Sequence, residues 1–247
     1  MPKIFLSPST QDWNAYVTGT GSEEYHMNLL ADALEPYLLS NGIRWVRNTP
    51  DMTAAGSIRQ ANDLGGFDFY LALHSNAAGV GSEGSARGII VFYYPTSASG
   101  RRAAELFAAR LREVYPLPEL VRTQPTTALG EVRQPRYPAN LIEIGYHDNP
   151  DDARWIESSR DQTARALTRA LCEYFGLPFI EPQPVRTGVV STAGSALRLR
   201  EYPGTEGRVL AAMPNGAPVE VCGAWQGWYV VHYRELVGYA AAAYIQT

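Results

Sequence analysis

Hydrophobic and polar positions alternate in two different ways along this chain, and the change comes near residue 176. Before that point, short apolar runs rich in β-branched and aromatic residues predict strands, and longer segments with apolar residues at helical spacing predict helices. The predicted strands are 3–7, 43–46, 67–74, 88–94 and 140–146. The predicted helices are 23–42, 57–63, 100–115 and 160–175. Strands that alternate with helices predict an α/β fold, with a twisted, mostly parallel sheet and helices on both faces.

The segment 177–186 marks a change in the pattern. It contains three prolines, Pro178, Pro182 and Pro184, and is typical of a semi-rigid linker. Beyond it, helical spacing disappears, and short strand-like runs are separated by Gly, Pro and Asn, which predicts a small β-barrel. The sequence therefore predicts three parts: a domain over 1–176, a linker over 177–186 and a second domain over 187–247.

Composition excludes several classes of protein. The chain has 247 residues, 45% hydrophobic and 19% charged, with a formal net charge of −4, which is typical of a globular protein. No cluster of Lys and Arg forms a basic surface, so we expect no nucleic-acid partner. The apolar runs are too short to span a membrane. We expect a monomer.

Two further features of the sequence concern its environment. Cys172 and Cys222 have no paired spacing and are expected to be free thiols. The N-terminal residues lack the apolar stretch of a secretory signal, so we expect synthesis in the cytoplasm.

Glu143 is a carboxylate within an apolar run, in the segment LIEIGYHDNPDD (141–152). Burying an unpaired charge costs several kcal/mol, so a partner is expected. A cation together with a catalytic role would provide one. The alternative is a structural salt bridge to Arg133 or Arg136.

Two other candidate residues lie at the ends of predicted elements. His74 ends an apolar strand, and Glu24 begins the first amphipathic helix. Alone, each has an ordinary explanation, as a structural histidine and as an acid that favours the helix dipole. In this topology, however, both reach the same sheet edge as Glu143. A histidine and a carboxylate with an open coordination position are what a catalytic zinc site requires.

Three blocks in this order resemble the zinc-dependent N-acetylmuramoyl-L-alanine amidases over residues 3–176. EEYHMNLLADAL resembles the block whose glutamate, four residues before an Asn, binds zinc; here that is Glu24. LALHSNAA resembles the block with a zinc-binding histidine, here His74. YPANLIEIGYHDNPDDARWI resembles the block with the catalytic glutamate, here Glu143.

The resemblance implies a peptidoglycan hydrolase that uses Zn²⁺ to cleave the amide between N-acetylmuramic acid and L-alanine. Zinc would polarise the carbonyl and activate water, and Glu143 would transfer the proton. We expect Gln11 and Asn76 to contact substrate.

One block departs from the family. Where its first strand carries a third zinc-binding histidine, this chain has Thr10, with Gln11 beside it. The site could recruit another histidine, keep zinc with two strong protein ligands, or have lost zinc. His147 is the best candidate for recruitment, and its alternative role is that of a hydrogen-bonded loop histidine. His26 is a poorer candidate, since it lies about 200° around the helix from Glu24.

The C-terminal sixty residues resemble a bacterial SH3-like (SH3b) domain. GSALRLREYPG and the Gly-Trp-Tyr and Gly-Tyr strands carry this resemblance. It implies a cell-wall-binding domain, in which Trp228 and Tyr229 are candidate substrate contacts. The alternative role of these aromatic residues is in the core of the barrel.

Two other functions stay open. The chain could be a catalytically inactive wall-binding protein, or a zinc amidohydrolase that acts on another acyl-amino acid. For the enzyme we expect peptidoglycan as partner and action outside the cell, as an endolysin or autolysin, after release by lysis or by another route.

Overall fold

The computed structural model describes residues 1–247, which form two compact units. One comprises 3–34 and 45–174. The other comprises 175–247 together with 1–2 and 35–44.

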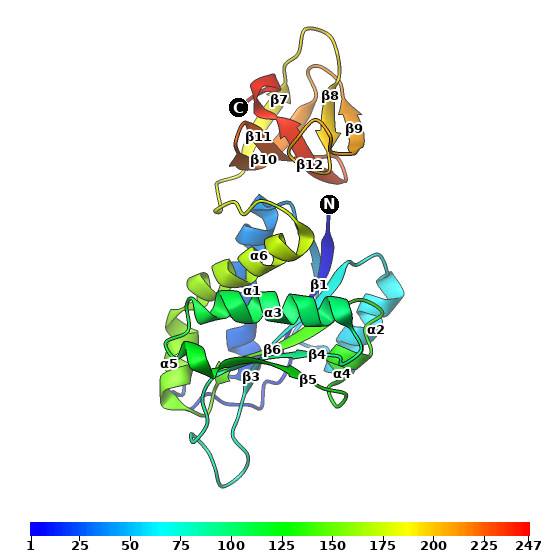
Figure 1. The fold of residues 1–247 in the computed structure, drawn as a ribbon. Coiled ribbons are helices and arrows are strands. Elements are labelled where there is room, and N and C mark those ends of the chain that lie inside the picture. The colour runs from blue at the N-terminus through cyan, green and yellow to red at the C-terminus, as the bar shows by residue number, and fades with distance from the viewer. The chain divides into compact units, whose positions relative to one another are not determined.

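The first unit is built on a six-stranded sheet with the order β2-β1-β3-β6-β4-β5 (Figure 1). Its strands are β1 (Lys3–Pro8), β2 (Arg44–Arg47), β3 (Phe69–Asn76), β4 (Ile89–Tyr93), β5 (Val121–Pro125) and β6 (Ala139–Tyr146). The β1–β3, β3–β6 and β4–β5 pairs are parallel, whereas β4 runs antiparallel to β6. The predicted mostly parallel α/β sheet is therefore confirmed, and β5 is a strand that the sequence pattern did not reveal.

Helices connect and cover these strands. They are α1 (Glu23–Ser40), α2 (Ala54–Leu64), α3 (Ala98–Arg112), α4 (Gly130–Arg133), α5 (Pro150–Ser158) and α6 (Arg160–Phe175), with a 3₁₀ turn η1 (Pro118–Leu120). All four helices predicted from apolar spacing are present. The short helix α4 was not predicted, because four residues are too few to show a helical period.

The two faces of the sheet are covered by different helices. On one face, Phe107 of α3 packs against Phe69. On the other face, α2 and α4 contribute Ile58 and Val132 to a core with Phe5 and other apolar residues. Helices thus lie on both faces, as the sequence predicted.

Alternation along β3 decides which side chains reach the functional region. Tyr70 and Ala72 belong to the core beneath α2 and α4. His74, two residues further along, lies on that same face, whereas Ser75 points to the other one. In the β3–β6 register, His74 lies beside Glu143. The two residues that the sequence analysis selected therefore lie side by side near the carboxyl ends of neighbouring parallel strands.

The second unit contains an all-antiparallel sheet with the order β13-β7-β10-β11-β12-β8-β9. Its strands are β7 (Arg186–Val190), β8 (Leu197–Arg200), β9 (Val209–Met213), β10 (Pro218–Trp225), β11 (Trp228–Tyr233), β12 (Leu236–Ala241) and β13 (Ile245–Gln246), with a 3₁₀ turn η2 (Ala242–Tyr244). Leu199, Met213, Val221 and Val231 lie in its apolar core. The predicted SH3-like β domain is confirmed as a fold.

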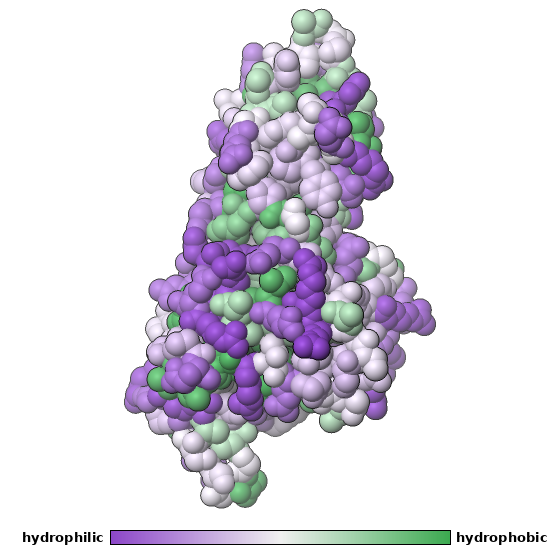
Figure 2. Space-filling view, in the orientation of Figure 1, coloured by the Kyte–Doolittle hydropathy of each residue, from purple (hydrophilic) through white to green (hydrophobic).

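Residues 177–185 form neither helix nor strand. The proposed domain limits at 176 and 186 stay predictions. No helix has the length and apolar character needed to cross a membrane. On the face seen in Figure 2, hydrophilic side chains surround small apolar areas.

Candidate active site

His74 is the centre of a buried group of ionisable side chains. Its ring Nδ1 lies 2.8 Å from Glu23 Oε1, and its Nε2 lies 2.9 Å from Glu131 Oε2. The side chain is only 9% exposed. Burial by itself would lower the pKa of His74, but the hydrogen bonds and charges of these carboxylates raise it well above its usual value. Each ring nitrogen faces a carboxylate oxygen at hydrogen-bond distance, an arrangement that favours a protonated ring.

The carboxylate that α1 brings to His74 belongs to Glu23, not to Glu24. Glu23 Oε2 also accepts a hydrogen bond of 2.7 Å from Asn14 Nδ2. Burial would raise the pKa of Glu23, but its interactions with His74 and Asn14 lower it. Glu24 instead accepts a hydrogen bond from Asn28 Nδ2 at 3.0 Å. The four-residue spacing to Asn28 thus selected Glu24, which contacts that Asn, while its neighbour reaches His74.

Glu131 is a site residue that the sequence analysis missed. It lies in α4, and its Oε1 accepts hydrogen bonds from Ser7 Oγ at 2.6 Å and Tyr70 OH at 2.7 Å. Burial would raise the pKa of Glu131, but His74 and these hydroxyls lower it. No pattern marks this position, because an isolated glutamate in a segment without predicted structure resembles an ordinary surface residue.

Glu143 lies beside His74 and is the least satisfied carboxyl of the group. Its Oε2 is buried without a hydrogen-bond partner. Burial raises the pKa of Glu143 to about 7; the positive charge of His74 opposes this rise, and Glu23 and Glu131 add to it. The alternative partners Arg133 and Arg136 are exposed. A carboxyl with such a pKa can both accept and return a proton near neutral pH.

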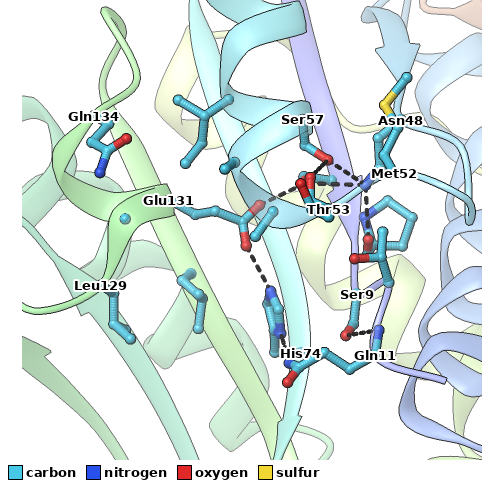
Figure 3. A pocket seen from close by; sticks show the side chains of 18 of the residues that line it. Ser9, Gln11, Asn48, Met52, Thr53, Ser57, His74, Leu129, Glu131 and Gln134 are labelled. Atoms are coloured by element: carbon cyan, nitrogen blue, oxygen red, sulfur yellow. Dashed lines mark hydrogen bonds and ion pairs between the residues drawn. The ribbon is translucent and has the colours of Figure 1, made fainter. Parts of the chain in front are cut away.

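His74, Glu131 and Glu143 border a cavity of about 430 Å³, whereas Glu23 lies behind His74 and is not part of its lining. Its lining includes Ser9, Thr10, Gln11, Trp13, His74 and Glu143. Figure 3 shows Glu131 reaching the His74 ring from one side and Gln11 approaching it from the other. Gln11 Nε2 lies 3.4 Å from His74 Nδ1 and 3.3 Å from Glu23 Oε1. The cavity is large enough to hold part of a substrate beside Glu143.

Three other candidates from the sequence do not reach this cavity. His147 Nδ1 lies 2.9 Å from Ser75 O and 3.1 Å from Ser75 Oγ, on the opposite face of the sheet. His147 is therefore a hydrogen-bonded loop histidine, which was the alternative to metal binding. Asn76 Oδ1 accepts a hydrogen bond from Ala77 N, and His26 lies 2.9 Å from Thr20 Oγ1.

The two aromatic candidates of the β unit have different surroundings. Trp228 lines a hollow of about 610 Å³ together with Tyr244 and Arg198. Tyr229 packs against the β-unit core, and the Arg186 guanidinium lies 5.5 Å from its ring centre. Trp228 is thus open to a ligand, whereas Tyr229 is partly a core residue.

The fit to zinc depends on the donor atoms around His74. No three His, Cys, Asp or Glu side chains gather so that they could hold a metal ion. His74 and Glu23 are nevertheless adjacent zinc-type ligands, and the amide of Gln11 adjoins both. Beside them, Glu143 Oε2 is a buried polar atom without a partner, which is typical of a site that takes an ion or a water. If a divalent cation binds here, Glu23 and His74 are the side chains that would hold it, with a third donor that is not histidine.

Comparison with known families gives two matches. Residues 9–173 match the model of the N-acetylmuramoyl-L-alanine amidase family, and residues 195–246 match the bacterial SH3 domain. No curated protein sequence matches the chain.

Solved structures with a similar fold include two N-acetylmuramoyl-L-alanine amidases and the catalytic domain of an endolysin. The amidase AmiC2 of Nostoc punctiforme is 17% identical, with a TM-score of 0.62 over 71% of this chain and 97% of that one. An N-acetylmuramoyl-L-alanine amidase from Clostridium difficile 630 is 19% identical, with a TM-score of 0.61 over 71% and 97%. The catalytic domain of the CD27L endolysin, which targets Clostridium difficile, is 18% identical, with a TM-score of 0.54 over 70% and 98%. At these identities the comparison supports the fold.

Proposed function

Because this chain belongs to the N-acetylmuramoyl-L-alanine amidase family, we propose that the cavity beside His74 is its catalytic site, with Glu143 as the proton-transfer residue. The reaction of the enzyme is hydrolysis of the amide bond between N-acetylmuramic acid and L-alanine in peptidoglycan. Water adds to the lactyl carbonyl carbon, the C–N bond breaks, and a carboxylate and the free amine of L-alanine result.

One observation carries the assignment of Glu143. It is the single carboxyl bordering the cavity whose pKa is raised, to about 7, while Glu23 and Glu131 are held ionised. A general base works best when its pKa lies near the working pH. Glu143 takes a proton from the attacking water and then delivers it to the leaving nitrogen.

Zinc is part of this proposal. Glu23 and His74 would hold the ion, with a weaker third donor in place of the histidine that the family uses. When bound, zinc supplies a Lewis acid that polarises the amide carbonyl and lowers the pKa of water. The ionised Glu131 keeps the His74 ring in place through the 2.9 Å contact with Nε2.

Trp13 is a candidate contact for the glycan. Its side chain lines the cavity and yet is 71% exposed. Exposure of so large an apolar ring costs free energy unless a ligand covers it, and sugar rings present apolar faces of suitable size. We place the muramic acid ring against Trp13.

The β unit has a supporting role in the proposal. The bacterial SH3 match and the hollow beside Trp228 support binding to the wall. A second binding site on an insoluble polymer lengthens residence and raises the effective concentration of substrate.

The experiment incubates the protein with purified peptidoglycan and measures two products. Release of L-alanine amino groups without new reducing ends identifies amide cleavage. Equal release from acyl-amino acids without glycan would instead indicate a different amidohydrolase. Binding to the wall without release of amino groups would indicate a wall-binding protein that does not cleave the amide. The presence of Thr10 in place of the family's histidine is the observation that favours this alternative.

A further inference from the structure

We propose that Gln11 supplies the third protein donor to the metal through its side-chain oxygen, and that Glu131 positions His74 for this site. The proposal rests on the proposed function, since it names how the chain holds the ion used there. It gives Gln11, which the sequence analysis expected to contact substrate, a role as metal ligand. It gives Glu131, which no sequence pattern revealed, a role in positioning His74.

Three side-chain atoms of Glu23, His74 and Gln11 lie close to one another. Glu23 Oε1 and His74 Nδ1 lie 2.8 Å apart, and the Gln11 amide nitrogen lies 3.3 and 3.4 Å from them. Two ligands at a shared tetrahedral zinc, each about 2.1 Å from the ion, are separated by roughly 3.4 Å. The two distances to Gln11 match those between ligands of one cation, whereas the Glu23–His74 pair is at hydrogen-bond distance and would have to widen by about 0.6 Å to admit an ion.

The Gln11 amide can present either its nitrogen or its oxygen to Glu23 and His74. Oxygen and nitrogen of a glutamine side chain are interchangeable in shape, so their assignment follows from the neighbours. Without a metal, Nε2 faces Glu23 and donates to it. With a cation present, rotation by about 180° turns the oxygen inward. Asn14 then loses its 3.3 Å contact with Gln11 Oε1 and keeps its 2.7 Å hydrogen bond to Glu23.

None of the other histidines is placed to act as the third ligand. His26 is held by Thr20 and Arg160, and His147 lies on the opposite face of the sheet beside Ser75. His232 belongs to the β unit, where it lies 3.7 Å from Glu220. A third donor must therefore come from the residues around the cavity, and the Gln11 side chain lies against both Glu23 and His74.

Glu131 acts through His74. Metal-binding histidines commonly donate their second ring N–H to a carboxylate, which fixes the ring and makes the ligating nitrogen more basic. Glu131 Oε2 accepts the hydrogen bond from His74 Nε2 in this way, and hydrogen bonds from Ser7 and Tyr70 hold the Glu131 carboxylate in place. The remaining nitrogen, Nδ1, is directed at Glu23 and Gln11.

Charge supports a cation at this place. The buried group contains the carboxyl groups of Glu23 and Glu131 on either side of His74, with Glu143 beside them. A divalent cation here would offset the negative charge of these acidic groups and provide a partner for the unsatisfied Glu143 Oε2. Because an amide oxygen is a weaker zinc ligand than imidazole, we expect weaker zinc binding than with three strong ligands.

The test measures zinc affinity of the full chain by chelator competition and zinc content by elemental analysis. We expect about one zinc per chain in the wild type, affinity at least about tenfold lower in Gln11→Ala, and at least about tenfold higher in Gln11→His. The matched control is Thr10→Val, which changes the neighbouring cavity residue and should leave affinity within about twofold. Loss of zinc in Thr10→Val instead would assign the third donor to Thr10 and overturn the proposal.

Glu131→Gln tests the positioning role. We expect zinc affinity to fall about 10- to 100-fold and the ¹⁵N resonance of His74 Nε2 to shift, while the protein stays folded. An unchanged affinity would make Glu131 only structural.

The outcomes separate this proposal from the function on which it rests. A wild-type protein that binds no zinc, with the same Tm in zinc and in EDTA, removes the metal from the proposed function and this inference with it. Zinc binding by the wild type with unchanged affinity in both Gln11 variants removes only the role of Gln11.

Discussion

Glu131 Oε2 lies 2.9 Å from His74 Nε2, so a residue of an unpredicted four-residue helix fixes the ring at the centre of the site. The two residues are 57 positions apart in the chain. The sheet brings them together because β3, which carries His74, pairs with β6, against which α4 packs. A buried histidine held at both nitrogens has one ring orientation, and this fixed orientation is a requirement of precise ligand geometry.

Replacement of the base should separate turnover from metal binding. In Glu143→Gln we expect amide hydrolysis to fall by about 10²–10⁴-fold, because the amide cannot accept the proton from water. Zinc content and Tm should stay near the wild-type values. The exposed Glu105→Gln serves as control and should keep full activity. Wild-type turnover in Glu143→Gln would assign the base to another residue.

The pH dependence of stability should report the environment of Glu143. Burial raises its folded-state pKa to about 7, above the value of about 4.3 in an unfolded chain. The proton is therefore held more tightly in the folded protein, and this contribution to stability is complete below the unfolded pKa and lost as the pH rises through about 7. Urea unfolding of the metal-free wild type, compared with Glu143→Gln, should show the loss between roughly pH 5 and 8. Parallel curves for the two proteins would contradict a buried, protonated Glu143.

Asp152 should be the more important of two adjacent aspartates for stability. Its fully buried carboxylate accepts hydrogen bonds from Arg87 Nε, Tyr115 OH and Tyr146 N. Asp152→Ala leaves these donors without a partner and should reduce the free energy of unfolding by about 3–5 kcal/mol. Asp151→Ala removes an exposed carboxylate that forms ion pairs with Arg87 and Arg154, and should change the free energy of unfolding by less than about 1 kcal/mol. Equal values in urea unfolding would argue against this assignment.

Trp13→Ala should weaken substrate binding. Loss of the contact between the ring and the glycan is expected to cost about 1 kcal/mol, which is about a fivefold rise in KM on soluble muropeptides, with little change in kcat. Tyr202→Ala, which removes an exposed aromatic residue of the β unit, is the control on the same substrates. A fall in kcat alone would place Trp13 outside the substrate contact.

Trp228→Ala should weaken binding to the insoluble wall and leave soluble substrates unaffected. The indole lines the hollow of the β unit and is accessible, so its loss removes contact area without opening the core. Co-sedimentation with purified wall should fall several-fold, while hydrolysis of soluble muropeptides stays constant. Unchanged co-sedimentation together with slower hydrolysis of soluble muropeptides would show that the hollow does not bind the wall.

The sequence predicted the sheet and helices well because their patterns are long and regular. The runs at 67–74 and 140–146 match β3 and β6 within two residues at each end. The antiparallel direction of β4 was not predictable, since strand periodicity is the same in both directions. The polar segment 121–125 lacks the apolar alternation of a strand, and its pairing with β4 is decided by the fold.

The site was predictable where residue type and strand position agreed. His74 and Glu143 lie side by side because both end buried parallel strands. Glu23 and Glu24 could not be separated by residue type, because the choice depends on a fraction of a helical turn at the start of α1. Glu131 requires the tertiary contact between α4 and the sheet, which no local pattern contains.

Because side chains alternate along β3, two adjacent residues of this strand lie in different environments on opposite faces of the sheet. His74 faces the cavity, and Ser75, the next residue, meets His147 on the other side. Deletion of one residue between Phe69 and Leu73 would exchange these positions, placing a hydroxyl among the carboxylates and an imidazole in the layer beyond. Such a one-residue shift along the strand would disrupt both ligand binding at the cavity and packing of the sheet. The type of an individual side chain such as Gln11 can therefore change more easily than the length of β3 can.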